Sequence, residues 1–144
     1  MRLNLGCGRK ILEGYINSDV VALEGVDVVL NADDIWPWDD GSIDEILAEH
    51  VFEHVNNPIH FMTEAHRVLA DDGLLHIIVP SWQSIDAFTD PTHKRFCTVN
   101  TFDYWLPGTP HFQNNEAYGN VSFKGIKRVH DGRTIDVMMR KVIQ

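Results

Sequence analysis

Cysteines and long apolar runs are both scarce in this 144-residue chain. The two cysteines, Cys7 and Cys97, lack the repeated spacing of a disulfide framework, which favours a reducing compartment. No uninterrupted apolar run approaches the roughly 20 residues that span a bilayer. Polar residues from Asn4 onward also interrupt the stretch behind Met1 where a signal peptide would lie. We therefore expect a cytoplasmic protein with no membrane partner.

Basic residues are few in the first ninety positions. Residues 1–90 hold 17 Asp and Glu against 4 Lys and Arg, a net charge of −13, whereas residues 91–144 hold 4 acids against 8 bases, a net charge of +4. Binding to nucleic acid phosphates needs a basic surface, so no nucleic-acid partner is expected. The basic final section fits either an anionic substrate or an ordinary solvated hairpin.

A length of 144 residues predicts a single domain over residues 1–144, and no internal repeat, low-complexity segment or linker occurs before residue 90. The gaps between its first expected strands are too short for full crossover helices, since parallel strands usually need a dozen or more connecting residues. The apolar runs that predict strands in this half are Arg2–Leu5, Tyr15–Val20, Val26–Leu30 and Ile43–Ala48.

The second half of the chain predicts a helix, a buried strand and a hairpin. Asn57-Pro58 supplies a helix N-cap and a first-turn proline, and Asp72-Gly73 is expected to end that helix before a strand at Leu74–Val79. Asp131-Gly132 lies between two strand-like runs, a strong hairpin signal. The helical face expected to be buried comprises Ile59, Met62, Ala65, His66 and Leu69.

The segment between the expected strand and the hairpin is irregular and rich in Pro, Gly, Asn and aromatic residues. Loops of this length are uncommon in compact domains unless they cover a site. We therefore interpret residues 81–117 as a covering or acceptor-binding region.

The first chemical feature is Gly6-Cys7-Gly8, directly after the first expected strand. Glycines there allow the backbone to approach a ligand that a β-carbon would exclude. The dinucleotide fingerprint G-x-G-x-x-G is incomplete, because Ile11 holds its third glycine position. Taken alone, the tripeptide fits a plain tight turn as well as a ligand loop.

Two aspartates follow at the ends of the next two expected strands. Asp19 ends the second strand, where a carboxylate suits the ribose hydroxyls of an adenosine, and Asp33 follows the third, where it suits the adenine amino group. Open α/β sheets bind ligands at this edge. Taken alone, each aspartate fits an ordinary strand-end or turn residue better than a ligand contact.

Taken in order, these and later motifs resemble a shortened branch of the type 11 group of class I S-adenosylmethionine-dependent methyltransferases. The resemblance extends to about residue 104. The segments that carry it are Leu3-Asn4-Leu5-Gly6-Cys7-Gly8, Tyr15-Ile16-Asn17-Ser18-Asp19, Trp36-Pro37-Trp38, Ser42-Ile43-Asp44-Glu45-Ile46, Glu49-His50-Val51-Phe52-Glu53-His54, Arg67-Val68-Leu69-Ala70-Asp71-Asp72-Gly73, Asp90-Pro91-Thr92-His93-Lys94-Arg95-Phe96 and Thr101-Phe102-Asp103-Tyr104.

The resemblance implies a Rossmann-like α/β sheet of seven strands, mostly parallel, with one antiparallel strand from the C-terminal hairpin and few helices near the N-terminus. It also implies S-adenosylmethionine as the methyl donor. By this resemblance the donor-binding residues are Asn4, Gly6, Cys7 and Gly8 beside the methionine part, Asp19 at the ribose, Asp33 at the adenine, and His50 in the pocket wall.

Two histidine patterns bear on catalysis. His50 to His54 spells H-x-x-E-H, an inverted zincin pattern, but we expect His50 at a strand exit rather than inside a helix, with Glu53 and His54 starting a short helix. We therefore expect no metal there. His93 lies in the expected covering region beside Lys94 and Arg95, which suits a general base near an anionic acceptor, or else a structural turn.

The expected function is methyl transfer from S-adenosylmethionine to an oxygen or nitrogen of a small-molecule or sugar acceptor, with His93 and His50 as the catalytic candidates. Two alternatives stay open at this point. One is a non-catalytic S-adenosylmethionine-binding or partner module, and the other is a zinc hydrolase. The sequence leaves the oligomeric state undetermined.

Overall fold

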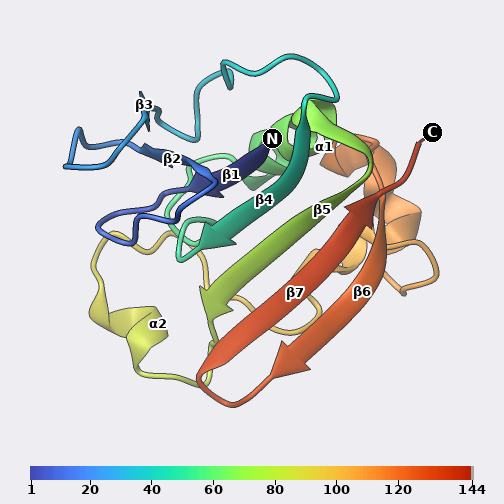
Figure 1. The fold of residues 1–144 in the computed structure, drawn as a ribbon. Coiled ribbons are helices and arrows are strands. Elements are labelled where there is room, and N and C mark those ends of the chain that lie inside the picture. The colour runs from blue at the N-terminus through green and yellow to red at the C-terminus, as the bar shows by residue number, and fades with distance from the viewer. Residues whose placement is uncertain (144) are drawn as a thin grey trace.

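The computed structural model describes residues 1–143 and forms one mixed seven-stranded sheet, with the order β3-β2-β1-β4-β5-β7-β6 (Figure 1). The first five strands run parallel, and β7 is antiparallel to both β5 and β6. This confirms the expected sheet with its single antiparallel strand. The strands are β1 (Arg2–Leu5), β2 (Ile16–Asp19), β3 (Val28–Val29), β4 (Ile43–Glu49), β5 (Leu69–Pro80), β6 (Phe123–His130) and β7 (Thr134–Lys141).

Helices are few and short. No helix precedes β4 within residues 1–143, which confirms the expected loss of the first crossover helices. The helical segments are α1 (Pro58–Val68), α2 (Asp86–Thr89) and two 3₁₀ turns, η1 (Thr101–Trp105) and η2 (Phe112–Tyr118). Among the described residues, no helix combines the length and apolar character needed to cross a membrane.

The start of α1 agrees with the sequence, but its end does not. Asn57 Oδ1 accepts hydrogen bonds from the Ile59 and His60 amides at 3.1 and 3.0 Å, as expected for an N-cap before a first-turn proline. The helix ends at Val68, because Leu69 is already extended and pairs with β4. Asp72-Gly73 therefore lies inside β5, where a left-handed Asp72 (φ 61°) accompanies a register shift.

The buried face of α1 also differs from the expected one. The helix side chains that enter the core are Phe61, Met62, Ala65 and Val68, whereas His66 is half-buried and donates from Nε2 to the Val142 carbonyl. Ile59 likewise remains half-buried. The core is thus centred on Phe61, which packs edge-on against Trp36 and Phe52.

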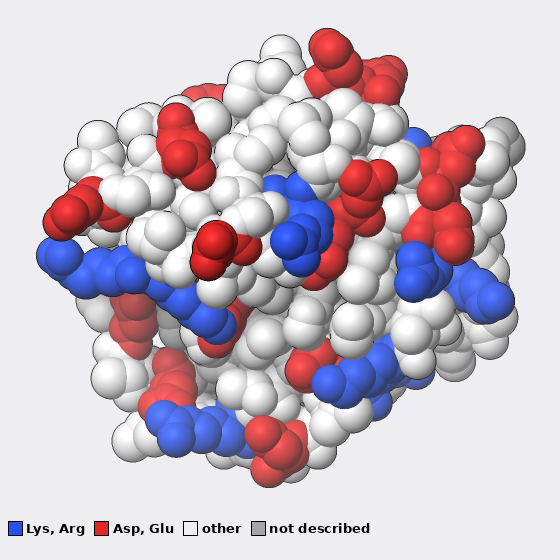
Figure 2. Space-filling model, viewed as in Figure 1, with Lys and Arg blue, Asp and Glu red and all other residues white. Residues whose placement is uncertain are grey.

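In Figure 1, α1 lies behind the sheet and α2 lies beyond the carboxyl ends of β4 and β5, so the face toward the viewer has no helical cover. Along β5, Leu75, Ile77 and Val79 point into the core and are fully buried, while the alternating residues on the other face stay half-buried. Basic and acidic side chains are interspersed over that open side (Figure 2). Local pairing of this kind neutralises much of the positive charge expected for the C-terminal hairpin.

Candidate functional site

The glycine loop, residues 6–8, follows the end of β1 and is hydrogen-bonded to the end of β2. Gly6 and Gly8 both have positive φ (64° and 52°), the left-handed region that favours glycine. The Cys7 amide donates to the Ser18 carbonyl at 2.9 Å, and the Gly8 amide donates to Asp19 Oδ2 at 2.8 Å. The loop is therefore held open against the strand ends although no helix follows it.

A β-carbon is tolerated differently at the two glycines. At Gly6 it would lie 2.3 Å from Val51 Cγ2, whereas at Gly8 no atom lies within 4 Å. We expect Gly6→Ala to lower the free energy of unfolding by about 2–4 kcal/mol, because overpacking adds to the left-handed strain. Gly8→Ala, which carries only the strain, is the matched control and should cost about 1–2 kcal/mol. Equal losses in urea denaturation would contradict the overpacking argument.

Asp19 and Asp33 both line one cavity, but their carboxylates accept different sets of hydrogen bonds. Asp19 Oδ2 accepts from Gly8, and Oδ1 accepts from the Val21 amide at 3.0 Å, so each oxygen keeps a lone pair. Asp33 accepts three hydrogen bonds from the backbone amides of Asn56 and Asn57, at 2.8–3.1 Å. Asp33 therefore also anchors the segment that leads into α1.

The cavity has a volume of about 380 Å³ and adjoins a second hollow of about 230 Å³ through Gly6 and His50. A volume of several hundred cubic ångströms is typical of small-molecule sites. The first cavity is lined by Leu5, Gly6, Asp19, Val20, Leu30, Asn31, Ala32, Asp33, His50, Val51, His54, Val55, Asn56 and Lys94. The second is lined by Asn4, Gly6, Cys7, Lys10, Glu49 and His50.

Asn4 and Cys7 shape the second hollow. The Asn4 side chain is buried and donates from Nδ2 to the Lys10 carbonyl at 2.8 Å and to Asn17 Oδ1 at 2.9 Å, which fixes the course of the glycine loop. Burial raises the pKa of the Cys7 thiol, so Cys7 remains a neutral wall residue rather than a nucleophile. Lys10 Nζ forms an ion pair with Glu49 at 2.6 Å across the same hollow.

His50 lies between the two hollows, at the exit of β4 as the sequence predicts. Its backbone is left-handed (φ 57°), an unusual conformation for a residue with a β-carbon and one that is common at functional sites. Its side chain is half-exposed, and Nδ1 lies 3.6 Å from Glu53 Oε2. The interaction with Glu53 raises the pKa of His50 above its usual value, against the opposing effect of burial.

Glu53 does not lie where the sequence predicts. It begins no helix: residues 52–54 form a turn, and the Glu53 side chain is 2% exposed, with no hydrogen bond to either carboxylate oxygen. A buried carboxylate without partners is costly and needs a compensating charge. The H-x-x-E-H spacing brings Glu53 to His50, but the pattern acts as a histidine–carboxylate pair at a turn.

The region expected to cover the site, residues 81–117, does not bring His93 to the cavity as the sequence predicts. His93 is not in the cavity wall: its side chain is 8% exposed, and Nδ1 donates to the Ala87 carbonyl at 2.8 Å. Arg95 is occupied by the carbonyls of Phe52 and Val55. Lys94, bonded to Asn56 Oδ1, is the residue of this group that lines the cavity. The expectation that His93 points into the cleft is therefore wrong.

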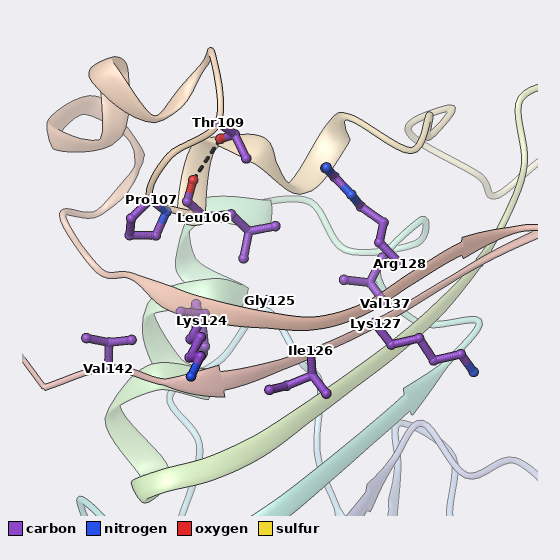
Figure 3. Close-up of a pocket in the computed structure, with 11 residues that line it drawn as sticks. Leu106, Pro107, Thr109, Lys124, Gly125, Ile126, Lys127, Arg128, Val137 and Val142 are labelled. Atoms are coloured by element: carbon purple, nitrogen blue, oxygen red, sulfur yellow. Dashed lines mark hydrogen bonds between the residues drawn. The ribbon is translucent and has the colours of Figure 1, made fainter.

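A larger hollow, of about 630 Å³, lies elsewhere, between β6 and the Leu106–Thr109 segment (Figure 3). This is the opposite edge of the sheet from β2 and β3. Two of the three cations that line it are engaged with acids, since Arg128 pairs with Asp103 and Lys127 lies 3.1 Å from Asp136. It lacks both the glycine loop and the strand-end carboxylates, so the smaller cavity is the candidate site.

One family model and one curated protein match parts of this chain. Residues 18–77 match the family model described as a methyltransferase domain. An uncharacterized 37.1 kDa protein of a Streptomyces fradiae transposon is 38% identical over 63 residues, which make up 44% of this chain and 18% of that protein. The chain thus matches less than a fifth of that relative's length.

Solved structures show the same fold at low sequence identity. A SAM-dependent methyltransferase from Aquifex aeolicus aligns with a TM-score of 0.66 and 18% identity, over 98% of this chain and 81% of that one. The 1,6-didemethyltoxoflavin-N1-methyltransferase of Burkholderia thailandensis, with bound 1,6-didemethyltoxoflavin and S-adenosylhomocysteine, aligns with a TM-score of 0.61 and 14% identity, over 99% and 71%. The chain therefore carries a methyltransferase-domain match over residues 18–77 and has the fold of the S-adenosylmethionine-dependent class I methyltransferases.

Proposed function

We propose that this chain binds S-adenosylmethionine in the paired hollows and transfers its methyl group to an oxygen or nitrogen of a small-molecule or sugar acceptor. The observation that carries the proposal is the meeting of Gly6, Asp19 and His50 around one cavity at the carboxyl ends of β1, β2 and β4. Ligands bind at this edge in open α/β sheets.

The lining of the two hollows supports a specific orientation of the donor. Free lone pairs on Asp19 suit the ribose hydroxyls, and the apolar walls formed by Leu30 and Val51 suit the flat adenine. Asp33 still has acceptor capacity for the adenine amino group. The smaller hollow, beside Asn4, Cys7 and the Lys10–Glu49 pair, is then left for the methionine part.

Methyl transfer is an in-line displacement in which the acceptor's lone pair forms the new bond to carbon as the carbon–sulfur bond breaks. Holding two reactants in line lowers such a barrier by roughly 7–11 kcal/mol. The acceptor also loses a proton. His50 is the base we assign, because Glu53 faces its Nδ1 and leaves Nε2 to receive that proton.

Acceptor recognition is assigned to residues 81–117, within the single domain of residues 1–144. Lys94 supports this assignment, since its ammonium group lies at the cavity wall. A cation there suits an acceptor that carries a carboxylate or phosphate.

The proposal is tested by calorimetry with S-adenosylmethionine and S-adenosylhomocysteine, followed by an assay of S-adenosylhomocysteine release with phenols, amines and monosaccharides as acceptors. Binding together with acceptor-dependent release supports it. Binding without release across the panel would favour a non-catalytic S-adenosylmethionine-binding module, and absence of binding would overturn both.

We expect Asp19→Ala to weaken S-adenosylmethionine binding by about 1.5–3 kcal/mol, roughly 10- to 150-fold, because it removes hydrogen bonds to a charged group. Asp71→Ala is the matched control: Asp71 is exposed, in the amino-terminal part of β5. Calorimetry on variants shown to be folded by circular dichroism gives the answer. Unchanged affinity in folded Asp19→Ala would remove Asp19 from the donor site.

A further inference from the structure

Three side chains outside the proposed donor contacts converge beside the cavity. They are His54, Asp90 and His93, and one ligand atom from each lies within 4.8 Å of the others. His54 Nε2 is 3.9 Å and His93 Nε2 is 3.8 Å from Asp90 Oδ2. A four-coordinate ion with bonds of about 2.0–2.2 Å holds its ligands roughly 3.3–3.6 Å apart. A small inward movement of these side chains would therefore enclose a metal ion.

The surrounding hydrogen bonds leave the three facing atoms free. His93 Nδ1 lies 2.8 Å from the Ala87 carbonyl, which can only accept, so Nδ1 carries the proton and Nε2 keeps its lone pair. Asp90 Oδ1 accepts from both the amide and the hydroxyl of Thr92, at 2.8 and 2.7 Å. The Thr92 hydroxyl oxygen in turn accepts from His54 Nδ1 at 2.9 Å. Histidines and carboxylates that bind a metal typically hydrogen-bond in this way through the atoms that face away from the ion.

Direct contact between the three groups does not explain their arrangement. Separations of 3.8–3.9 Å are too long for hydrogen bonds, and none joins Asp90 Oδ2 to either ring among the described residues. The two rings also pack edge to face, with centroids 4.7 Å apart, and Nε2 of each ring lies beside the same carboxylate oxygen. The Lys94 amide donates to the Glu53 carbonyl at 2.8 Å, which ties the loop of residues 90–95 to the turn that bears His54.

We propose that His54, Asp90 and His93 bind a divalent transition-metal ion at the edge of the cavity, with zinc as the expected occupant. Two imidazoles and one carboxylate are a common zinc donor set, and three protein ligands leave a coordination position open. His54 belongs both to this triad and to the cavity wall, so the ion would adjoin the proposed methyl-transfer site. These ligands differ from the H-x-x-E-H set, with which they share His54 alone.

The test is calorimetric titration of the EDTA-treated chain with ZnCl₂ alone, with metal analysis after dialysis. We expect one zinc per chain, and at least tenfold weaker binding in Asp90→Asn and in His93→Ala. Thr92→Val removes only outer hydrogen bonds and should weaken binding about 10- to 100-fold. His60→Ala controls for surface histidines, and His50→Ala should bind zinc like the unaltered chain.

Several outcomes would overturn the metal site. These are the absence of stoichiometric zinc, equal binding in the Asp90 and His93 variants, or loss of zinc in His50→Ala. If His93→Ala fails to fold, Asp90→Asn and Thr92→Val decide the matter, because they change exposed side chains. The measurement uses neither methyl donor nor acceptor, so its failure is separate from failure of the proposed function.

Discussion

Replacing His50 with alanine is expected to lower acceptor-dependent S-adenosylhomocysteine release by about 10²–10⁴-fold, the range for loss of a general base. His50 lies between the two hollows, where the proposed adenosine and methionine parts of the donor join. Its left-handed backbone and its buried Glu53 partner hold the ring at that junction. Donor affinity by calorimetry should fall far less than turnover, because the proposed base acts on the acceptor and the ring is only one of several side chains that line the donor cavity.

The matched control for this substitution is His60→Ala, which removes an imidazole on α1 that contacts the Asp34 carbonyl and does not line the cavity. It should retain full turnover. Loss of donor binding and folding stability together in His50→Ala would instead mark His50 as structural. Full turnover would place the base elsewhere.

The pH dependence of turnover should reveal the interaction between His50 and Glu53. Glu53 raises the pKa of His50, and a base works only when neutral, so the rate should rise with pH through an inflection above the usual histidine value of about 6.5. Glu53→Gln keeps the size of the side chain but removes its charge, so the inflection should move to lower pH. If the inflection stays at the same pH, Glu53 does not raise the pKa of the catalytic base. The profile is measured at saturating donor.

The sheet could be predicted from the sequence because its signals are local. Short apolar runs followed by Gly6, Asp19 and the Asp131-Gly132 turn give strand positions and edges, and their close spacing excludes early crossover helices. The end of α1 could not be predicted in this way. Asp72-Gly73 reads as a helix stop, whereas strand pairing with β4 begins at Leu69 and overrides it.

The meeting of Gly6, Asp19, Asp33 and His50 at one cavity could also be predicted from the sequence, because parallel strand ends share one edge. The arrangement of residues 90–95 could not be predicted in this way. His93 and Lys94 are adjacent in sequence, yet one packs under His54 while the other lines the cavity, and only tertiary contacts decide which. The pairing of His50 with a buried Glu53 likewise depends on a turn whose backbone no local pattern specifies.

Replacing Arg67 with methionine should lower the free energy of unfolding by about 3–5 kcal/mol, the cost of leaving a buried ion without its partner. Arg67 binds both carboxylate oxygens of Glu64 at 2.8 Å, and Glu64 is 9% exposed. Arg67 also donates to the carbonyls of Trp36 and Trp38, at 3.0 and 2.9 Å. These contacts anchor the chain between β3 and β4, where a crossover helix is absent.

The loss of stability in Arg67→Met should become smaller as the pH falls. Bonding to Arg67 lowers the pKa of Glu64, so this contribution to stability is present above the unfolded glutamate value of about 4.3. It is lost as the pH falls through the lower folded value. In Arg67→Met the unpaired carboxylate is relieved by protonation, so the difference from the unaltered chain should already be smaller at about pH 4 and should shrink further below it.

Urea denaturation at pH 7.5 and at pH 4 measures this difference, with Glu64→Leu and the double variant completing a mutant cycle. The double variant should lose less stability than the two single losses combined, because it leaves no unpaired buried charge. It should not recover fully, since the Trp36 amide, which donates to Glu64 Oε2 at 2.7 Å, also loses its acceptor. Additive losses, or a difference that does not change with pH, would show that Arg67 acts through packing of its aliphatic stem and not through its charge.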